Sequence, residues 1–410
     1  MPHNLKLHKS TFRSPTEPIH IAGSKSESNR LLLLQALFPE LELANVSNSD
    51  DTVLMAQALA SQDSLINIQH AGTAMRFLTA FFAMQENKTL TLTGSQRMRQ
   101  RPIKILVDAL NQLGARITYL NANGFPPLQI EGKKLSGQTV TIHAGVSSQY
   151  ISALLLIGPK LKNGLQLKLT GQITSTPYIQ MTLELLHQIG VETHISANTI
   201  RVNPLKKALK TTIQVESDWS SASYFYSLIA LSPVGAQIAL TNFKKISYQG
   251  DAALAHIYKQ FGVFTSFHNN KITLKKTNLV PSNTTISLHL ANTPDIAQTI
   301  IVTCLGLGLS CKLTGLHTLK IKETDRLVAL KTELEKLGAS VVITTNSIRM
   351  AATKTILPDV CIATYNDHRM AMAFAPLALR TDLTILDAPV VSKSFPSFWT
   401  DLKATGIRLS

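Results

Sequence analysis

A pattern recurs about every 73 residues along this 410-residue chain, and such repetition constrains the fold more than any single motif does. In its first form, an amphipathic stretch ends in Gly followed by a small or β-branched residue. The stretches end at Gly114, Gly190, Gly262, Gly338 and Gly406, with spacings of 76, 72, 76 and 68 residues. Because Gly commonly follows the last turn of a helix, we predict that five helices stop at these positions.

The second form of the pattern is a polar residue that opens an apolar helix rich in small side chains. These predicted helix starts lie near Ser28, Thr73, Ser148, Ser221, Asp295 and Asp367, at intervals of 45, 75, 73, 74 and 72 residues. Alternating or apolar runs between the helices, such as 139–143 and 165–169, predict β-strands. We therefore interpret the chain as six copies of one α/β unit, of which the first is shortened by about 28 residues.

The formal net charge of the chain is +15, which favours an anionic partner. Its content of 44% hydrophobic and 16% charged residues is that of a folded protein, and its length is sufficient for two domains. Nucleic acid is not favoured, because no run of five Lys or Arg occurs and there are only two Trp. The N-terminus has no apolar signal core and the three Cys lack zinc-site spacing, so we expect a cytoplasmic protein without metal or membrane contact.

The predicted helix starts carry more than capping residues. Helix N-termini present free N–H groups and partial positive charge, and they bind anions readily. Ser, Thr and Asp at these positions are explained by capping alone. Capping does not explain the additional cations and amides, which are Lys25, Arg30, Gln149, His368 and Arg369. We therefore predict that these side chains gather at one end of each domain around an anionic ligand.

The sequence KETDR begins at Lys322 and precedes an amphipathic run that predicts a helix. Thr324 or Asp325 is suited to cap this helix. Lys322 and Arg326 are four residues apart and are predicted to share one helical face. Together with Glu323, these two cations suit an anionic substrate that also exchanges a proton. The alternative is an ordinary solvated helix start with one ion pair.

Several motifs, taken in order, point to one family. The most specific are GSKSESNR at 23–30, KETDR at 322–326 and YNDHRMAM at 365–372, and others lie at 71–76, 97–102, 147–149, 175–178, 220–224 and 393–396. Together they closely resemble the 5-enolpyruvylshikimate-3-phosphate synthase family of the shikimate pathway, from about residue 20 to residue 403. The first motif does not indicate a nucleotide-binding loop, because it lacks P-loop spacing.

The resemblance implies an α/β fold, namely a two-domain inside-out α/β barrel. Each domain of this fold has three βαβαββ-type repeats about a pseudo-threefold axis, and the first repeat is truncated in this chain. The N-terminal domain, with repeats 1–3, is expected to span 22–214. The C-terminal domain, with repeats 4–6, is expected to combine 1–21 with 215–410, and the active site is expected in the interdomain cleft.

The resemblance also implies a reaction. The family transfers the enolpyruvyl group of phosphoenolpyruvate to the 5-hydroxyl of shikimate 3-phosphate and releases phosphate, in aromatic amino acid biosynthesis and without a cofactor or metal. Asp295 is implied as the base for the hydroxyl, Glu323 as the proton carrier at the methylene carbon, and Lys25 as a catalytic contact to both substrates.

The same resemblance implies two sets of binding residues. Those implied to hold shikimate 3-phosphate are Lys25, Ser26, Arg30, Ser147, Ser148, Gln149, Ser175, Tyr178, Asp295 and Lys322. Those implied to hold phosphoenolpyruvate are Lys25, Gly72, Arg101, Gln149, Arg326, His368, Arg369 and Lys393.

Three substitutions depart from the family pattern, in addition to the short first repeat. His70 stands where Asn is usual, Phe77 stands where Pro is usual, and Thr318 replaces an Asn that contacts shikimate 3-phosphate. None of them removes a charged catalytic group. We therefore expect altered affinity and inhibitor response, and an unchanged reaction class.

Two alternatives stay open at the level of sequence. The sister enolpyruvyl transferase, which acts on UDP-N-acetylglucosamine, typically uses a Cys in a loop of its first domain, whereas segment 95–102 has none. The non-enzyme alternative is a basic repeat protein that binds nucleic acid or a phosphorylated ligand. We expect instead a monomer whose partners are its two small-molecule substrates, with no nucleic acid and no membrane.

Overall fold

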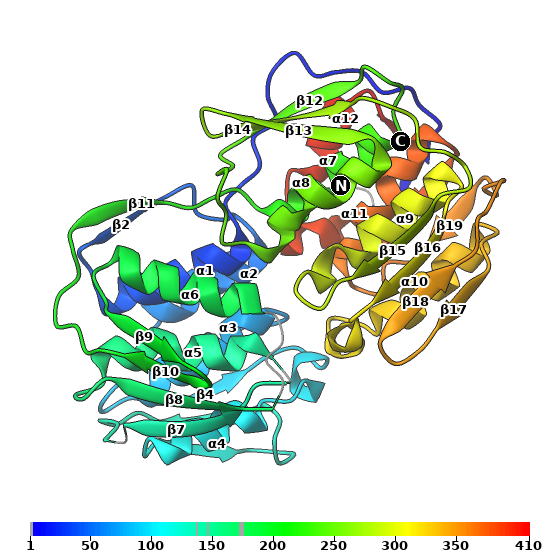
Figure 1. The fold of residues 1–410 in the computed structure, drawn as a ribbon. Helices are drawn as coiled ribbons and strands as arrows, with labels where there is room; N and C mark the ends of the chain where they lie inside the picture. Colours follow the sequence, from blue (N-terminus) through cyan, green and yellow to red (C-terminus); the bar gives the residue numbers. More distant parts are fainter. Residues whose placement is uncertain (1–2, 137, 146, 172–175) are drawn as a thin grey trace. The chain divides into compact units, whose positions relative to one another are not determined.

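The computed structural model describes residues 3–136, 138–145, 147–171 and 176–410 (Figure 1). The chain divides into two compact units. The N-terminal unit is Gly23–Val215, and the C-terminal unit combines Met1–Ala22 with Glu216–Ser410. These bounds differ by one residue from the ranges expected from the sequence.

The N-terminal unit alternates helices and short strands. Its elements are α1 (Lys25–Leu37), β2 (Leu41–Ala44), α2 (Asp50–Ala60), β3 (Leu65–Asn67), α3 (Gly72–Ala83), β4 (Thr89–Thr93), η1 (Met98–Gln100), α4 (Lys104–Gln112), β5 (Arg116–Tyr119), β6 (Leu128–Glu131), β7 (Thr139–His143), α5 (Ser148–Ile157), η2 (Gly158–Lys160), β8 (Leu165–Thr170), α6 (Thr176–Gln188), β9 (Thr193–Ser196), β10 (Thr199–Val202) and β11 (Thr211–Gln214).

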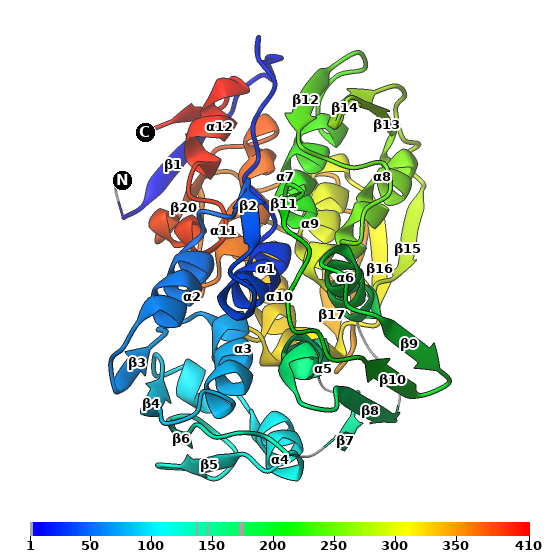
Figure 2. The ribbon, with the colours of Figure 1, turned by 90° about the vertical axis from the view of Figure 1, so that its left-hand side faces the viewer.

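Two sheets of the N-terminal unit have the same strand order, β3-β4-β6-β5 and β7-β8-β10-β9 (Figure 2). In each sheet the first two strands are parallel and the last two form an antiparallel hairpin. The first repeat keeps only the parallel pair, in which β2 lies beside β11. After α2 the chain passes directly into β3, so the missing part of this repeat is the hairpin.

The C-terminal unit repeats the same alternation. Its elements are β1 (Leu5–His8), α7 (Trp219–Ala230), β12 (Gln237–Thr241), η3 (Gly250–Ala253), α8 (Leu254–Ile257), η4 (Tyr258–Phe261), β13 (Val263–His268), β14 (Lys271–Lys276), β15 (Thr285–His289), η5 (Pro294–Ile296), α9 (Ala297–Leu307), β16 (Ser310–Thr314), η6 (His317–Ile321), α10 (Arg326–Lys336), β17 (Val341–Ile343), β18 (Ser347–Met350), β19 (Val360–Ile362), α11 (His368–Phe374), η7 (Ala375–Leu379), β20 (Leu383–Ile385), η8 (Ala388–Lys393), α12 (Phe398–Ala404) and β21 (Arg408–Leu409).

The N-terminal segment of the chain completes two sheets of the C-terminal unit. Sheet β19-β20-β1-β21 has the same order as β15-β16-β18-β17, and β1 supplies its third strand. Sheet β12-β14-β13 has three strands, and Ile19 forms a parallel bridge to Leu240 of β12, at the place of a first strand. Five of the six repeats therefore share one strand order, which confirms the predicted α/β repeat.

The first helix of each repeat lies inside its unit, and these helices contact one another: α1, α3 and α5 in one unit, and α7, α9 and α11 in the other (Figure 1). Polar groups one repeat apart meet between them. Gln149 Nε2 donates to Thr73 Oγ1 at 3.2 Å, and the Ser223 and Thr299 hydroxyls lie 2.9 Å apart. Both pairs are separated by 76 residues, about one repeat, so nearly equivalent positions of neighbouring repeats face each other.

The five predicted glycine stops are confirmed, since Gly114, Gly190, Gly262, Gly338 and Gly406 have φ of 73° to 93°. In this left-handed region a side chain would be strained.

The predicted helix starts are less accurate. Asp367 caps α11 as expected, but α1 begins at Lys25, three residues before Ser28, and Asp295 lies in a 3-10 turn before α9. Ser28 is polar for another reason, because its hydroxyl accepts a hydrogen bond from Ser47 N. Among the described residues, no helix combines the length and apolarity that crossing a membrane requires.

We expect strand β1 to be essential for the stability of the C-terminal unit. Leu7 is fully buried and pairs with both Leu383 and Leu409. Leu7→Ala should lower the free energy of unfolding by about 2–5 kcal/mol, measured by urea denaturation. Lys6→Ala alters the exposed face of the same strand and should change it by less than about 1 kcal/mol. Equal effects of the two substitutions would contradict the role assigned to the strand.

Candidate functional site

A buried arginine organises the first cluster of candidate residues, in the C-terminal unit. Arg326 begins α10 because Asp325 caps this helix, accepting from the backbone N–H groups of residues 327 and 328. Its guanidinium donates to three carboxylates: Nε to Asp367 at 2.7 Å, Nη1 to Asp295 at 2.9 Å, and Nη2 to Glu323 at 2.7 Å. The cluster thus joins the segments that precede α9, α10 and α11.

Lys322 enters this cluster in a way that the sequence did not predict. It lies before the helix with an extended backbone, so the prediction that Lys322 and Arg326 share a helical face is wrong. The physical reason is the Asp325 cap, which starts the helix only at the following residue. The two cations meet instead at Asp295, whose Oδ1 lies 3.3 Å from Lys322 Nζ.

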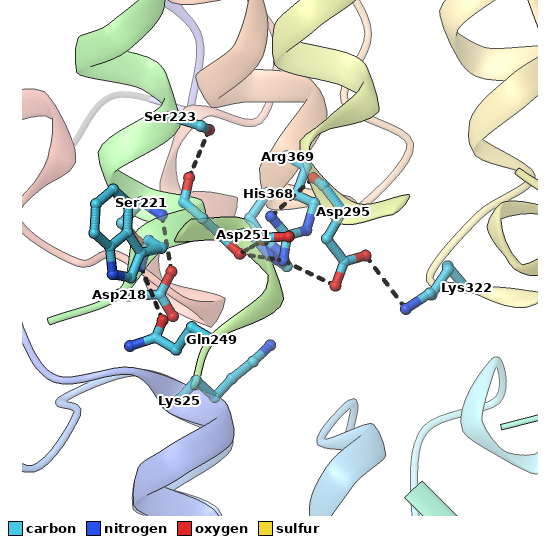
Figure 3. Close-up of polar contacts among 12 residues, drawn as sticks. Lys25, Asp218, Ser221, Ser223, Gln249, Asp251, Asp295, Lys322, His368 and Arg369 are labelled. Carbon is cyan, nitrogen blue, oxygen red and sulfur yellow. Dashed lines mark hydrogen bonds and ion pairs between the residues drawn. The ribbon is translucent and has the colours of Figure 1, made fainter. Parts of the chain in front are cut away.

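Asp295 is surrounded by cations, and Figure 3 shows Lys322 on one side of its carboxylate and Arg369 on the other. Arg369 Nη2 lies 3.3 Å from Asp295 Oδ2, and Nη1 donates to the Asp295 backbone carbonyl at 3.2 Å. Burial alone would raise the pKa of Asp295, but Arg369, Lys322 and Arg326 outweigh it and hold that pKa well below its usual range. Asp295 is therefore a carboxylate, ready to accept a hydrogen bond.

A second carboxyl group lies on the other side of Arg369, and sequence reasoning missed it. Arg369 Nη2 is 3.4 Å from Ser220 Oγ, and this hydroxyl donates in turn to Asp251. Burial, together with the negative charge of Asp295, raises the pKa of Asp251 to about 7. The sequence signal was weak, because Asp251 stands in a short 3-10 turn of the fourth repeat and in none of the recurring helix starts.

The segment before α11 holds two more predicted residues. Asp367 caps α11 by accepting from Arg369 N at 2.9 Å, and His368 is buried beside it. Lys393 Nζ donates to the Asn366 backbone carbonyl at 2.8 Å and to its Oδ1 at 2.6 Å. Hydrogen bonds and ion pairs thus connect Asp295, Lys322, Glu323, Arg326 and Arg369 in the C-terminal unit. His368 Nδ1 lies 3.8 Å from Asp367 Oδ1 in the same cluster, and Lys393 is held by Asn366, the residue that precedes Asp367.

The N-terminal unit has its own group of polar residues at helix starts. Lys25 Nζ, in the first turn of α1, lies 3.4 Å from Asp51 Oδ2. His70 Nε2 lies 3.7 Å from the other oxygen of Asp51. His70, a departure from the family pattern, is thus close to Lys25 through a shared carboxylate. Sequence reasoning missed Asp51 because it lies in α2, whose start is outside the recurring pattern.

Arg30 is buried, and its guanidinium is already engaged by the protein. Nε donates to Thr182 Oγ1 at 2.7 Å, Nη1 to the Ser26 carbonyl at 2.7 Å, and Nη2 to Ser152 Oγ at 2.9 Å and the Tyr178 carbonyl at 3.3 Å. Burial lowers the pKa of Arg30 to about 10. The described contacts place Arg30 as a support for Ser26 and Tyr178.

Gly72 and Arg101 are in close contact. A Cβ atom on Gly72 would lie 2.5 Å from Arg101 Nη1, so any other residue there would displace the guanidinium from its present position. Arg101 is 9% exposed, and its Nε has no hydrogen-bond partner among the described residues. A buried donor without a partner is costly, and an anionic ligand would supply the missing acceptor.

The start of α5 supplies the remaining predicted residues. Ser147 caps this helix by accepting from Gln149 N at 3.3 Å, and Ser148 is its first residue. Ser175 lies outside the described residues. Among the described residues, no group of three or more His, Cys, Asp or Glu side chains is arranged to hold a metal ion.

The fold and these clusters define a class of protein: an α/β barrel built from two three-repeat units, with cations at the starts of its inner helices. The family model of EPSP synthase (3-phosphoshikimate 1-carboxyvinyltransferase) matches residues 57–402. A 3-phosphoshikimate 1-carboxyvinyltransferase of Bacteroides fragilis (strain YCH46) is 48% identical over 394 residues, which cover 95% of each chain. The protein of that name from Shewanella halifaxensis is 35% identical, covering 94% of this chain and 96% of its own.

The chain therefore belongs to the EPSP synthase family, as its motifs indicated. The solved structure of EPSP synthase from Acinetobacter baumannii covers 99% of both chains with a TM-score of 0.78 at 22% identity. This similarity confirms the predicted fold class, the inside-out α/β barrel.

Because of Asp251, the free energy of unfolding of the wild type should fall as pH rises from about 4 to 7. Its folded pKa, about 7, exceeds the usual value of 3.8, so between these values the unfolded chain loses the proton first and unfolding is favoured. Asp251→Asn cannot titrate. Its free energy of unfolding should therefore rise relative to the wild type as pH increases from about 4 to 7, by up to about 1.4 kcal/mol per pH unit.

Urea denaturation at several pH values measures this difference. Asp359→Asn, at an exposed carboxylate, serves as the control and should show little dependence on pH. A constant difference between Asp251→Asn and the wild type across this range would contradict the raised pKa.

Proposed function

We propose that the two polar clusters form the active site for the reaction of this family. The chain is an enzyme, a 3-phosphoshikimate 1-carboxyvinyltransferase, which transfers the enolpyruvyl group of phosphoenolpyruvate to the 5-hydroxyl of shikimate 3-phosphate. The observation that best supports the site is the buried Arg326, which holds Asp295 and Glu323 as acceptors 2.9 Å and 2.7 Å from one guanidinium.

The charges suit the substrates. Each substrate carries a phosphate and a carboxylate, which bind best to fixed Arg and Lys side chains. For phosphoenolpyruvate we propose Lys25, Gly72, Arg101, Gln149, Arg326, His368, Arg369 and Lys393. For shikimate 3-phosphate we propose Lys25, Ser26, Arg30, Ser147, Ser148, Gln149, Ser175, Tyr178, Asp295 and Lys322, with Arg30 acting through the groups that it holds.

The proposed mechanism is addition followed by elimination. Asp295 takes the proton of the 5-hydroxyl while the hydroxyl oxygen bonds to C2 of phosphoenolpyruvate, and a protonated Glu323 donates its proton to the methylene carbon, which becomes a methyl group. In the elimination, Glu323 takes a proton back from the methyl group and the bond between C2 and the phosphate oxygen breaks. The phosphate leaves with the proton that Asp295 took from the hydroxyl, so both carboxyl groups return to their starting states. Substrate anions that compete with Asp295 for Arg369 and Lys322 would weaken the effect that keeps its pKa low, and so make it a better base.

Two further points are part of the same proposal: the chain acts as a monomer, and it works in the cytoplasm. Support for the assigned binding residues comes from the family membership and from the anion-suited helix starts in each unit.

Release of inorganic phosphate tests the function. It should require both phosphoenolpyruvate and shikimate 3-phosphate, and replacing shikimate 3-phosphate by UDP-N-acetylglucosamine should abolish it. Phosphate release with the nucleotide sugar instead would favour the sister transferase. Binding of mixed-sequence RNA that weakens steeply with salt, without turnover, would favour the non-enzyme alternative.

Two substitutions separate the proposed roles of the carboxylates. Glu323→Gln keeps the shape of the side chain but cannot carry a proton, so kcat should fall by about 10²–10⁴-fold with little change in substrate binding. Asp295→Ala should impair both product formation and exchange of the phosphoenolpyruvate methylene protons with solvent, while shikimate 3-phosphate still binds. Steady-state kinetics and isothermal titration measure these effects.

Asp325→Asn is a matched control, because it removes a neighbouring carboxylate that caps α10 and keeps a capping side chain. Its kcat should stay near that of the wild type. If Glu323→Gln behaved like this control, Glu323 would not be the proton carrier.

A further inference from the structure

Glu333 is a fully buried carboxylate in α10 that the mechanism does not use. Its Oε1 accepts from the Tyr365 hydroxyl at 2.6 Å, and its Oε2 accepts from Ala363 N at 3.2 Å. Lys336 Nζ donates to both oxygens, at 2.9 Å and 2.8 Å. A buried charge is tolerated only when it is paired and hydrogen-bonded, so each of these contacts matters energetically.

Two of these contacts hold the loop between β19 and α11, which has an unusual backbone. Tyr365 and Asn366 are consecutive residues with φ of 53° and 57°, in the left-handed region. Such a conformation costs free energy in residues other than Gly and persists only where the surroundings enforce it. Tyr365 is 38% exposed, and its hydroxyl bond to the buried Glu333 ties this turn to α10.

The residues next in the chain carry the proposed phosphoenolpyruvate site. Asn366 holds Lys393 through two hydrogen bonds. Asp367 accepts from Arg326 Nε and caps α11, which places Arg369. A shift of the Tyr365–Asn366 turn would therefore move the cations on both sides of it.

We propose that Glu333 and Tyr365 are positioning residues, which clamp the left-handed turn so that Lys393 and Arg369 are held for phosphoenolpyruvate. This inference rests on the proposed function. Burial and the nearby Glu333 raise the pKa of Tyr365 to about 12, so the phenol stays protonated and donates to the carboxylate throughout the neutral range.

A purely structural role makes a different prediction. If Glu333 only stabilised the fold, weakening its contacts would lower stability and leave the Michaelis constants unchanged. A positioning role predicts a selective change in KM for phosphoenolpyruvate, because a small displacement of binding groups is costly. The two roles are therefore separable by kinetics.

Tyr365→Phe is the sharpest test, since it removes one hydroxyl from a half-exposed ring. We expect KM for phosphoenolpyruvate to rise about tenfold, while KM for shikimate 3-phosphate changes less than about twofold. Lys336→Met is the matched control, because among the described residues Lys336 bonds the same carboxylate and the Cys361 carbonyl of β19, and it has no hydrogen bond to Tyr365 or Asn366. It should lower the melting temperature and leave both KM values unchanged.

A double-mutant cycle tests whether Tyr365 affects KM for phosphoenolpyruvate by positioning Lys393. If Tyr365 acts through Asn366 and Lys393, Tyr365→Phe should add little to the rise in KM caused by Lys393→Ala. Additive losses, or an unchanged KM in Tyr365→Phe, would overturn the inference. The wild type is assayed first, because failure to turn over both substrates would count against the proposed function and not against the clamp.

Discussion

The burial of Arg326 among Asp295, Glu323 and Asp367 is the interaction on which the candidate site depends. Isolated charges cannot stay buried, so each member of this group requires the others. With Lys322 and Arg369 added, the cations and carboxylates balance in number. In the proposed reaction, anionic substrates would compete with the carboxylates for the same cations. Binding of their phosphate and carboxylate groups would thereby be coupled to the proton affinity of Asp295, as the proposed addition–elimination requires.

The repeat explains why such a cluster forms at all. Equivalent helices of successive repeats pack inside each unit, and nearly equivalent positions face one another, as Thr73 and Gln149 do across 76 residues. Helix starts that are distant in sequence are thereby brought to the same end of a unit. A few charged residues at these helix starts, such as Lys25, Asp295 and Arg369, are then enough to make a candidate site out of a structural repeat.

The sequence predicted the regular part of this structure well. Gly stops are set by local backbone geometry, so Gly114 and its four equivalents could be located from the sequence alone. Helix starts were less certain, because several polar residues near α1 compete for the capping position. Asp251, Asp51 and Glu333 could not be found in this way. Their importance arises from burial and from partners 26 to 32 residues away, namely Lys25, Ser220 and Tyr365, and no local pattern encodes these contacts.

The family resemblance implies that both Arg30 and Arg101 bind substrate, but the structure shows that their surroundings differ. Four hydrogen bonds of Arg30 go to protein oxygens, and its guanidinium carbon lies 5.3 Å from the ring centroid of Phe77. Phe77, which departs from the family pattern, thus packs against an arginine that links α1 to α6 through Thr182 and the Tyr178 carbonyl. Arg101 instead keeps a buried Nε without a partner among the described residues and lies directly over Gly72. The proposed roles therefore differ: Arg30 supports the groups around it, whereas Arg101 is proposed to contact the ligand, so the two need not tolerate the same substitutions.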